Sequence, residues 1–309
     1  MDDYPKTLWE LESEFSTEDA CRRYLVRLRW PAGYRCPRCQ GAKAWEDGAG
    51  LFRCVACDYK TSVTAGTIFE RTRKPLVTWF RAIWLVTSQK NGVSAKGVQR
   101  VLGLGSYETA WTWLHKLRRA MVRPGRDSLS GTIDVDETYV GGERPGKRGR
   151  GAEGKTLVLI AAQHDGDGIG RIRLTRVPDL LGETLGRAVQ TMVTAGSVVR
   201  TDGLKSYASL KNLGFAHEVV RPDESVGENL LPRCHRVASL LKRWLLGTHQ
   251  SYVSYEHLDY YLDEYTFRFN RRTSAHRGLL FYRLLQHAMA TGPVPYERIA
   301  KGVQGKPRQ

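Results

Sequence analysis

The spacing of apolar residues changes along the chain, and the expected secondary structure changes with it. Short amphipathic stretches over residues 7–15 and 18–28 predict two small helices. After a cysteine-rich region the pattern is helical from residue 74 to residue 123, with Pro75 at a position where helices favour proline. From residue 131 onward, alternating and continuous apolar runs predict β-strands. The chain therefore predicts several domains of mixed type.

The helical region contains two amphipathic stretches, Ser94–Leu102 and Ser106–Met121, separated by the short break Gly103-Leu-Gly105. This is the outline of a helix-turn-helix, and Ser106 is a favoured N-cap for the second helix. Any three-helix bundle can show such a turn, with Trp113 as a core residue. We interpret the region as a DNA-binding helix-turn-helix because of the domains on either side of it.

The region after residue 131 predicts an α/β domain. The expected elements are strands over 131–142, 155–162 and 170–177, a helix over 182–195, a strand over 197–202, a helix over 204–213 and a strand over 215–220. Three strands, a helix, a strand, a helix and a strand make up the ribonuclease-H-like order. In that topology the ends of the first and fourth strands lie side by side. Further helices are expected over residues 235–246, 254–269 and 275–290.

Four of the six cysteines form two Cys-x-x-Cys pairs separated by fourteen residues. This spacing matches a zinc ribbon, in which a tetrahedral Zn²⁺ replaces a core that is too small to be stable alone. Unpaired structural cysteines are the alternative. The expected zinc ligands are Cys36, Cys39, Cys54 and Cys57.

The chain is strongly basic, with a formal net charge of +16 and a pI near 9.7. Because the basic residues run along the whole chain, the expected partner is nucleic acid rather than a membrane surface. No apolar run reaches about 18 residues, and the acidic start is not a signal peptide. We expect a cytoplasmic protein that associates with the nucleoid.

Acidic residues occupy one face of the first strand of the α/β domain, where they are costly unless a cation lies over them. Asp136 on this strand and Asp202 at the end of the fourth strand would converge in the expected topology. Such a pair can hold two Mg²⁺ or Mn²⁺ ions about 3.5 to 4 Å apart for in-line phosphoryl transfer. Asp134 should share the face of Asp136, and Glu137 should point to the opposite face. The alternative for Asp202 is a purely structural role, because an Asp before a Gly is common in turns and needs no metal.

Several motifs together resemble the bacterial insertion-sequence transposases of the DDE class that carry an N-terminal zinc ribbon, the ISXO-type group. The motifs are Ile133-Asp-Val-Asp-Glu-Thr-Tyr-Val-Gly-Gly142, Thr201-Asp-Gly-Leu-Lys-Ser-Tyr207, Lys242-Arg-Trp-Leu-Leu-Gly-Thr-His249 and Tyr261-Leu-Asp-Glu-Tyr-Thr-Phe-Arg-Phe-Asn-Arg-Arg272. The resemblance implies binding of terminal inverted repeats, cleavage at their 3′ ends, strand transfer into target DNA, and at least a dimer on DNA. It also selects Asp136 over Asp134 as the first catalytic residue.

The residue at the third ligand position is not the acid that the name of the DDE class implies. Such transposases usually carry a Glu seven residues before a Lys, whereas the residue seven positions before Lys242 is His235, and some members of the group have Asn or His there. A helix would place His235 and Lys242 on one face, so that His235 meets the aspartates and Lys242 meets a DNA phosphate. An imidazole ligand favours Mn²⁺ over Mg²⁺. A solvated histidine in a degenerate site is the alternative, with Glu224 or Glu228 as substitute carboxylates.

The leading hypothesis is a DDE-type transposase. The alternatives are a non-catalytic DNA-binding regulator with the same domains, and a metal-dependent nuclease that cuts without joining. The expected domains are N-terminal helices over 1–30, the zinc ribbon over 31–66, the helix-turn-helix-like domain over 67–126, the ribonuclease-H-like catalytic domain over 127–292 and a basic tail over 293–309.

Overall fold

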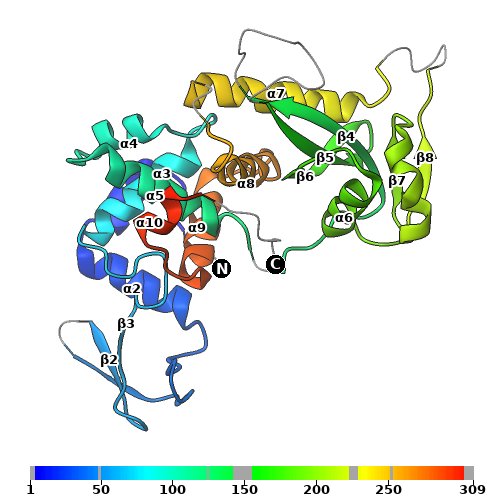
Figure 1. The fold of residues 1–309 in the computed structure, drawn as a ribbon. Coiled ribbons are helices and arrows are strands. Elements are labelled where there is room, and N and C mark those ends of the chain that lie inside the picture. The colour runs from blue at the N-terminus through cyan, green and yellow to red at the C-terminus, as the bar shows by residue number, and fades with distance from the viewer. Residues whose placement is uncertain are drawn as a thin grey trace. The chain divides into compact units, whose positions relative to one another are not determined.

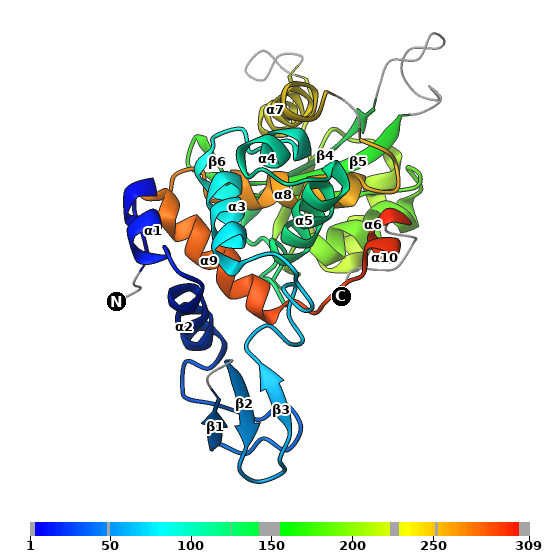
Figure 2. The same ribbon diagram turned by 90° about the vertical axis from the view of Figure 1, so that its left-hand side faces the viewer.

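The computed structural model describes residues 4–47, 50–123, 125–141, 155–222, 229–250 and 253–302. The chain divides into two compact units, residues 1–123 with 273–301 and residues 124–272 with 302–309 (Figures 1 and 2). Two expected features fall outside the described residues, namely the carboxylates Glu224 and Glu228 and the last seven residues of the basic tail, 303–309. In the described part of the chain, no helix is long and apolar enough to cross a membrane.

The first unit is helical apart from a small sheet, and its expected helices are present. They are α1 (Leu8–Glu14), α2 (Glu18–Arg29), α3 (Leu76–Ser88), α4 (Ala95–Val101), α5 (Tyr107–Ala120), α9 (Arg277–Ala290) and α10 (Tyr296–Ala300). The side chains of Thr7, Thr17, Ser94 and Ser106 each accept a backbone N–H at a helix start. These caps satisfy N–H groups that the helix cannot bond itself, so the sequence specifies where the four helices begin.

Helix α9 lies in the core of the first unit, where it packs against α2, α3 and α5. Its Phe281 ring contacts the rings of Phe15, Phe80 and Trp84. The expected catalytic domain runs to residue 292, whereas the second unit breaks off at residue 272. The physical reason is the apolar face of α9, which is buried among the aromatic residues of the N-terminal helices. The expected basic tail likewise contains α10, whose Ile299 is fully buried.

A three-stranded antiparallel sheet in the first unit carries the cysteine pairs. Its strands are β1 (Ala44–Glu46), β2 (Leu51–Cys54) and β3 (Lys60–Ser62), in that order. One face is covered, because the Phe52 ring packs against the rings of Trp30 and Tyr34. This is a small apolar contact, as expected for a sheet that depends on a metal.

The second unit is built on a five-stranded mixed sheet in the order β6-β5-β4-β7-β8. Its elements are β4 (Thr132–Val140), β5 (Thr156–Asp165), β6 (Gly168–Arg176), α6 (Gly182–Met192), β7 (Val198–Thr201), η1 (Lys205–Leu213), β8 (Ala216–Val219), α7 (Pro232–His249) and α8 (Leu258–Phe269). Strands β4 to β6 are antiparallel, and β7 and β8 run parallel to β4. The ribonuclease-H-like order is therefore confirmed. The segment η1 is a 3₁₀ helix, which places its buried Tyr207 and Leu210 on one side because that helix has three residues per turn.

Helices cover both faces of this sheet (Figure 1). Helix α6 and η1 share one apolar core with the strands, and α7 and α8 share the other. The C-terminal end of α8 is tied to edge strand β6 by Asn270, whose side chain both accepts from Ile172 N at 2.7 Å and donates to Ile172 O at 3.0 Å. Arg268 forms a buried pair with Glu264, and Arg272 donates to Gly170 O. These contacts give both arginines a role in the fold.

Candidate functional site

Strand β4 presents its aspartates to one face of the sheet and its apolar residues to the other. Ile133 and Val135 belong to the core beneath α6 and η1, and Val140 belongs to the core beneath α7 and α8. The two-residue period therefore directs Asp134 and Asp136 toward α7. In the parallel pairing of β4 with β7, Asp134 lies opposite Arg200.

Asp202 follows the last residue of β7 and lies two positions beyond Arg200, the residue that pairs with Asp134. Its side chain is exposed, and its Oδ1 accepts the N–H of Leu204 at 3.0 Å. This bond is the turn chemistry that an Asp before Gly203 predicts, and Gly203 supplies the positive φ of +89°. The same carboxylate raises the pKa of Asp136, so it also lies within electrostatic reach of that group.

Asp136 is a mostly buried carboxylate among other acids, with 15% of its side chain exposed. Burial raises its pKa to about 6, and the charges of Glu137 and Asp202 act in the same direction. The N–H of Glu137, which donates to Asp136 Oδ1 at 2.9 Å, and the His235 ring oppose this rise. A carboxylate whose ionised form is disfavoured by burial and by like charges is stabilised by a divalent cation.

His235 extends from the first turns of α7 to the same carboxylate. Its Nε2 lies 3.3 Å from Asp136 Oδ2, and 51% of its side chain is exposed. On the other side of the ring, Nδ1 contacts Asn229 Oδ1. An Nδ1–H donated to Asn229 directs the Nε2 lone pair toward the aspartates, which is how histidine ligands are usually oriented. Asn229 was not selected from the sequence, since nothing in its local pattern marks it.

The three predicted ligands come from the central strand β4, the end of the neighbouring strand β7 and the start of α7. Among the described residues, only the four paired cysteines form a group of three or more whose ligand atoms all lie within 4.8 Å of one another. Asp136, Asp202 and His235 are therefore more widely spread.

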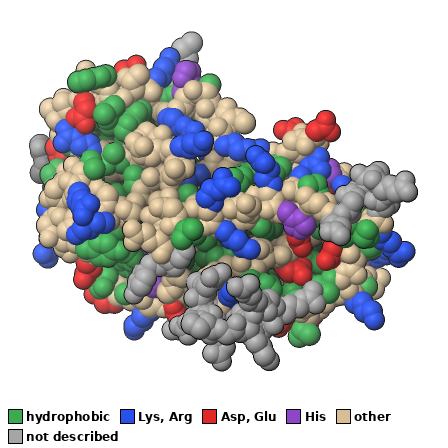
Figure 3. Space-filling view, turned by 90° about the horizontal axis from the view of Figure 1, so that it is seen from above, with side chains coloured by type: hydrophobic (Ala, Val, Ile, Leu, Met, Phe, Trp, Pro, Cys, Tyr) green, Lys and Arg blue, Asp and Glu red, His purple; other side chains and the backbone are tan. Residues whose placement is uncertain are grey.

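Lys242 lies two helical turns after His235 on α7, with its side chain exposed. Partial burial and the nearby charge of Lys155 lower the pKa of Lys242. Figure 3 looks onto the side of the molecule on which α7 lies and shows Lys and Arg side chains gathered beside a histidine and a small group of acidic side chains. Basic side chains at this place suit the phosphates of a nucleic acid.

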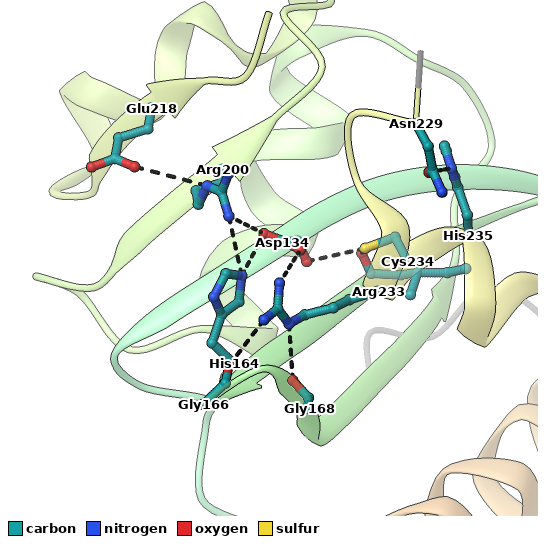
Figure 4. A network of polar contacts seen from close by, with 11 residues as sticks. Asp134, His164, Gly166, Gly168, Arg200, Glu218, Asn229, Arg233, Cys234 and His235 are labelled. Carbon is teal, nitrogen blue, oxygen red and sulfur yellow. Dashed lines mark hydrogen bonds and ion pairs between the residues drawn. The ribbon is translucent and has the colours of Figure 1, made fainter. Parts of the chain in front are cut away.

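Asp134, the local competitor of Asp136, is fully buried and surrounded by cationic side chains (Figure 4). Its Oδ1 lies 2.7 Å from His164 Nε2 and 3.5 Å from Arg200 Nη1. Its Oδ2 lies 3.9 Å from Arg233 Nη1. Because the protein itself supplies the balancing charge, Asp134 has no need of a metal ion.

Glu137, the third acid of β4, lies on the opposite face, as strand alternation requires. Its Oε2 accepts the hydroxyl of Tyr207 at 2.9 Å. Burial, together with Glu137, raises the pKa of Tyr207 well above its usual range. Glu137 therefore acts on Asp136 through its charge and its backbone N–H, and not as a neighbour on the same face.

The four cysteines of the small sheet lie together as two knuckles. Cys36 Sγ is 3.6 Å from Cys57 Sγ, and Cys39 Sγ is 3.6 Å from Cys54 Sγ. A Cβ added at Gly41 would lie 3.3 Å from both Cys39 Sγ and Cys54 Sγ, so the backbone fits closely around the sulfurs. Four thiols in this arrangement match a structural zinc site.

The uncovered face of this small sheet carries one row of Trp45, Arg53 and Lys60, which pair with each other across β1, β2 and β3. Trp45 is 71% exposed. Arg53 is paired with Asp58, its Nη2 lying 2.8 Å from Asp58 Oδ2, while Lys60 is exposed. An exposed indole beside cationic side chains suits nucleic acid, because the ring can stack and the cations can meet phosphates.

Comparisons with known proteins agree with both units. A family model described as an ISXO2-like transposase domain matches residues 128–270, and one described as a transposase zinc-ribbon domain matches residues 16–60. The chain is also 28% identical over 277 residues to a protein of Halobacterium salinarum described as "Uncharacterized protein in transposable element ISH50". That match covers 82% of this chain and 91% of the relative.

Proposed function

Since the chain belongs to the insertion-sequence transposases that join a zinc ribbon to an ISXO2-like transposase domain, we propose that it mobilises its element by DDE-type chemistry. It binds the terminal inverted repeats, cleaves their 3′ ends and joins these ends to target DNA in the cytoplasm. The observation that supports this most directly is the contact of His235 Nε2 with Asp136 Oδ2 at 3.3 Å, within electrostatic reach of Asp202 just after the neighbouring strand β7.

In this proposal Asp136, Asp202 and His235 hold two Mg²⁺ or Mn²⁺ ions. The chemistry that such ions supply when bound is activation of the attacking oxygen and stabilisation of the leaving oxygen. Asp136 and Asp202 provide negative charge from two adjacent strands, and Asn229 orients the His235 ring. Lys242 binds a phosphate of the DNA strand and so places it along α7. An imidazole in place of a third carboxylate predicts higher activity with Mn²⁺ than with Mg²⁺.

DNA recognition is assigned to the first unit. Helices α4 and α5 form the expected helix-turn-helix, and the row of Trp45, Arg53 and Lys60 gives the ribbon a second contact with the terminal repeat. Joining two ends of an element calls for at least a dimer on DNA.

The decisive experiment incubates the purified protein with a labelled terminal-repeat duplex and Mn²⁺ or Mg²⁺. The proposal expects 3′-end cleavage followed by a joined product. No cleavage would support a DNA-binding regulator, and cleavage without joining would support a nuclease. If His235→Ala retains full metal-dependent activity, the third ligand is Glu224 or Glu228 instead.

The contact of the ribbon with DNA has its own test, in which Trp9 provides a matched control because it is 85% exposed on α1. Trp45→Ala should weaken binding of the terminal-repeat duplex roughly tenfold, the usual loss for a stacking aromatic ring. Lys60→Gln should lower the slope of log Kd against log salt by about one. Trp9→Ala should change neither quantity. Fluorescence anisotropy over a salt series measures both, and equal effects of the two Trp variants would contradict the assignment.

A further inference from the structure

Three consecutive residues in the first turn of α7 each contact the sheet differently, and Figure 4 shows the contacts of the first two, Arg233 and Cys234. Arg233 donates from Nε to Gly168 O and from Nη2 to Gly166 O, each at 2.9 Å. Cys234 is fully buried, and its Sγ donates to Asp134 O at 3.3 Å. The next residue, His235, reaches Asp136. The turn between β5 and β6 and strand β4 are therefore both joined to the start of α7.

The start of α7 has no side-chain cap of its own. The N-cap residue is Leu231, with φ −128° and ψ 65°, and it makes no side-chain hydrogen bond to the helix. By contrast, α1, α2, α4 and α5 all begin at a capping Ser or Thr. A helix start without a cap is less well fixed, so other contacts must determine where its first turn lies.

Arg233 is the side chain best placed to do so. Its side chain is 17% exposed. The guanidinium donates hydrogen bonds to the two carbonyls of the β5–β6 turn and forms an ion pair with the buried Asp134, whose Oδ2 lies 3.9 Å from Nη1. A planar guanidinium can donate to two carbonyls at once while it faces a carboxylate, which a single ammonium cannot do in the same geometry. Asp134 is itself held by His164 at 2.7 Å, so the anchor is fixed independently of α7.

We propose that Arg233 is a positioning residue, which uses Asp134 and the β5–β6 turn to hold the first turn of α7 so that His235 faces Asp136. This inference rests on the proposed function, because it assigns Arg233 to the orientation of a metal ligand. It explains why the motif carries two aspartates: Asp136 serves the reaction, and Asp134 holds the helix that brings the third ligand.

Arg200 separates positioning from simple charge balance. It also contacts Asp134, at 3.5 Å, and is within 3.9 Å of Glu218, both in the sheet. No described contact joins it to α7. Removing either arginine takes a positive charge away from an acidic site, which by Coulomb's law alone should strengthen the binding of a cation. Positioning predicts the opposite result for Arg233, and for Arg233 only.

The test measures Mn²⁺ binding to the zinc-loaded protein by electron paramagnetic resonance, counting only binding that Asp136→Asn abolishes. Arg233→Gln should weaken it roughly tenfold, the usual cost of losing a residue that orients a metal ligand. Arg200→Gln should bind Mn²⁺ as tightly as wild type or more tightly. Arg233→Lys keeps the positive charge and should also weaken Mn²⁺ binding. It keeps the proposal testable if Arg233→Gln fails to fold.

Amide hydrogen exchange in the metal-free protein provides the second readout. Exchange in the first turns of α7 should accelerate roughly tenfold in both Arg233 variants and stay near wild type in Arg200→Gln. Equal acceleration in the Arg200 variant, or unchanged Mn²⁺ affinity in the Arg233 variants, would overturn the proposal. If wild type itself shows no Asp136-dependent Mn²⁺ binding, the metal site fails, while the exchange data still decide whether Arg233 holds α7.

Discussion

Asp134 and Asp136 lie on the same strand, on the same face and two residues apart, yet their surroundings are opposite. Asp134 is fully buried against His164, Arg200 and Arg233. Asp136 is next to Glu137 and Asp202, and among the described residues its ion-pair partner is the His235 ring. The cost of removing a carboxylate from water is met by protein cations in the first case and is left for an external cation in the second.

A buried acid that serves the fold has surroundings unlike those of an acid that we propose to serve a reaction. The charge of Asp134 is balanced by protein cations, although its Oδ2 accepts no hydrogen bond among the described residues and only faces Arg233 at 3.9 Å. A carboxylate with a raised pKa beside other acids is a candidate functional group. The residues that make this difference, apart from the neighbouring Glu137, lie 30 to 99 positions away along the chain, from His164 beside Asp134 to His235 beside Asp136.

The largest expected effect comes from neutralising Asp136. Asp136→Asn and Asp202→Asn should each lower strand transfer roughly a thousandfold or more, because each removes a group that acts with the others as a unit. Neither variant should lose stability, since both relieve repulsion between like charges. Strand-transfer assays with Mn²⁺ and thermal unfolding of the same samples measure the two effects. Full activity in either variant would remove that residue from the site.

Asp134→Asn should instead act on stability. Removing the anion from a buried network leaves two arginines and a histidine without their partner, which typically costs about 3 to 5 kcal/mol. The free energy of unfolding, measured in urea, should fall by this amount in Asp134→Asn and should not fall in Asp136→Asn. A loss below about 1 kcal/mol would mean that Asp134 is not the centre of the network.

The sequence predicts much of this fold but not the contrast between the two aspartates. The order of strands follows from local apolar patterns, and the caps at Ser94 and Ser106 mark helix starts directly. The period of two also places Glu137 on the opposite face. The location of α9 is not predictable in this way, because its apolar face would fit either unit, and only the aromatic cluster around Phe281 decides.

The partners of the site are hidden from the sequence for a similar reason. His164 and Arg233 come next to Asp134 only through the register of β5 and the docking of α7. Asn229 behind His235 comes from the segment before α7 and has no local signature. Motif resemblance selects Asp136 over Asp134, but the physical basis of that choice is a tertiary arrangement.

The pH dependence of stability offers a finer test of the comparison. Burial and the neighbouring acids raise the pKa of Asp136 to about 6, whereas an unfolded Asp titrates near about 3.9. The folded metal-free protein therefore binds this proton more tightly, so Asp136 contributes stability below about pH 4 that is lost as the pH rises through about 6. The loss is on the order of 3 kcal/mol.

Wild type and Asp136→Asn should thus have similar unfolding free energies near about pH 4, with the variant more stable near about pH 7. Comparing the two proteins at each pH cancels the effect of acid on the zinc site, which both share. Parallel curves would show that the charge of Asp136 is already balanced, as it is for Asp134.

The smallest effect should come from the third acid of β4. Tyr207→Phe removes the hydroxyl that donates to Glu137 at 2.9 Å, on the face away from α7. A hydrogen bond to a charged acceptor contributes about 1.5 to 3 kcal/mol, and the variant should lose the lower part of this range because Glu137 has further interactions. The rate of strand transfer per folded molecule should change less than about threefold. The hydroxyl lies on the opposite face of the sheet, so its loss should change the activation free energy by less than about 1 kcal/mol. A much larger loss of activity at full stability would mean that Glu137 takes part in the reaction together with Asp136 and Asp202. Strand β4 would then carry two reactive acids, Asp136 and Glu137, beside the structural Asp134.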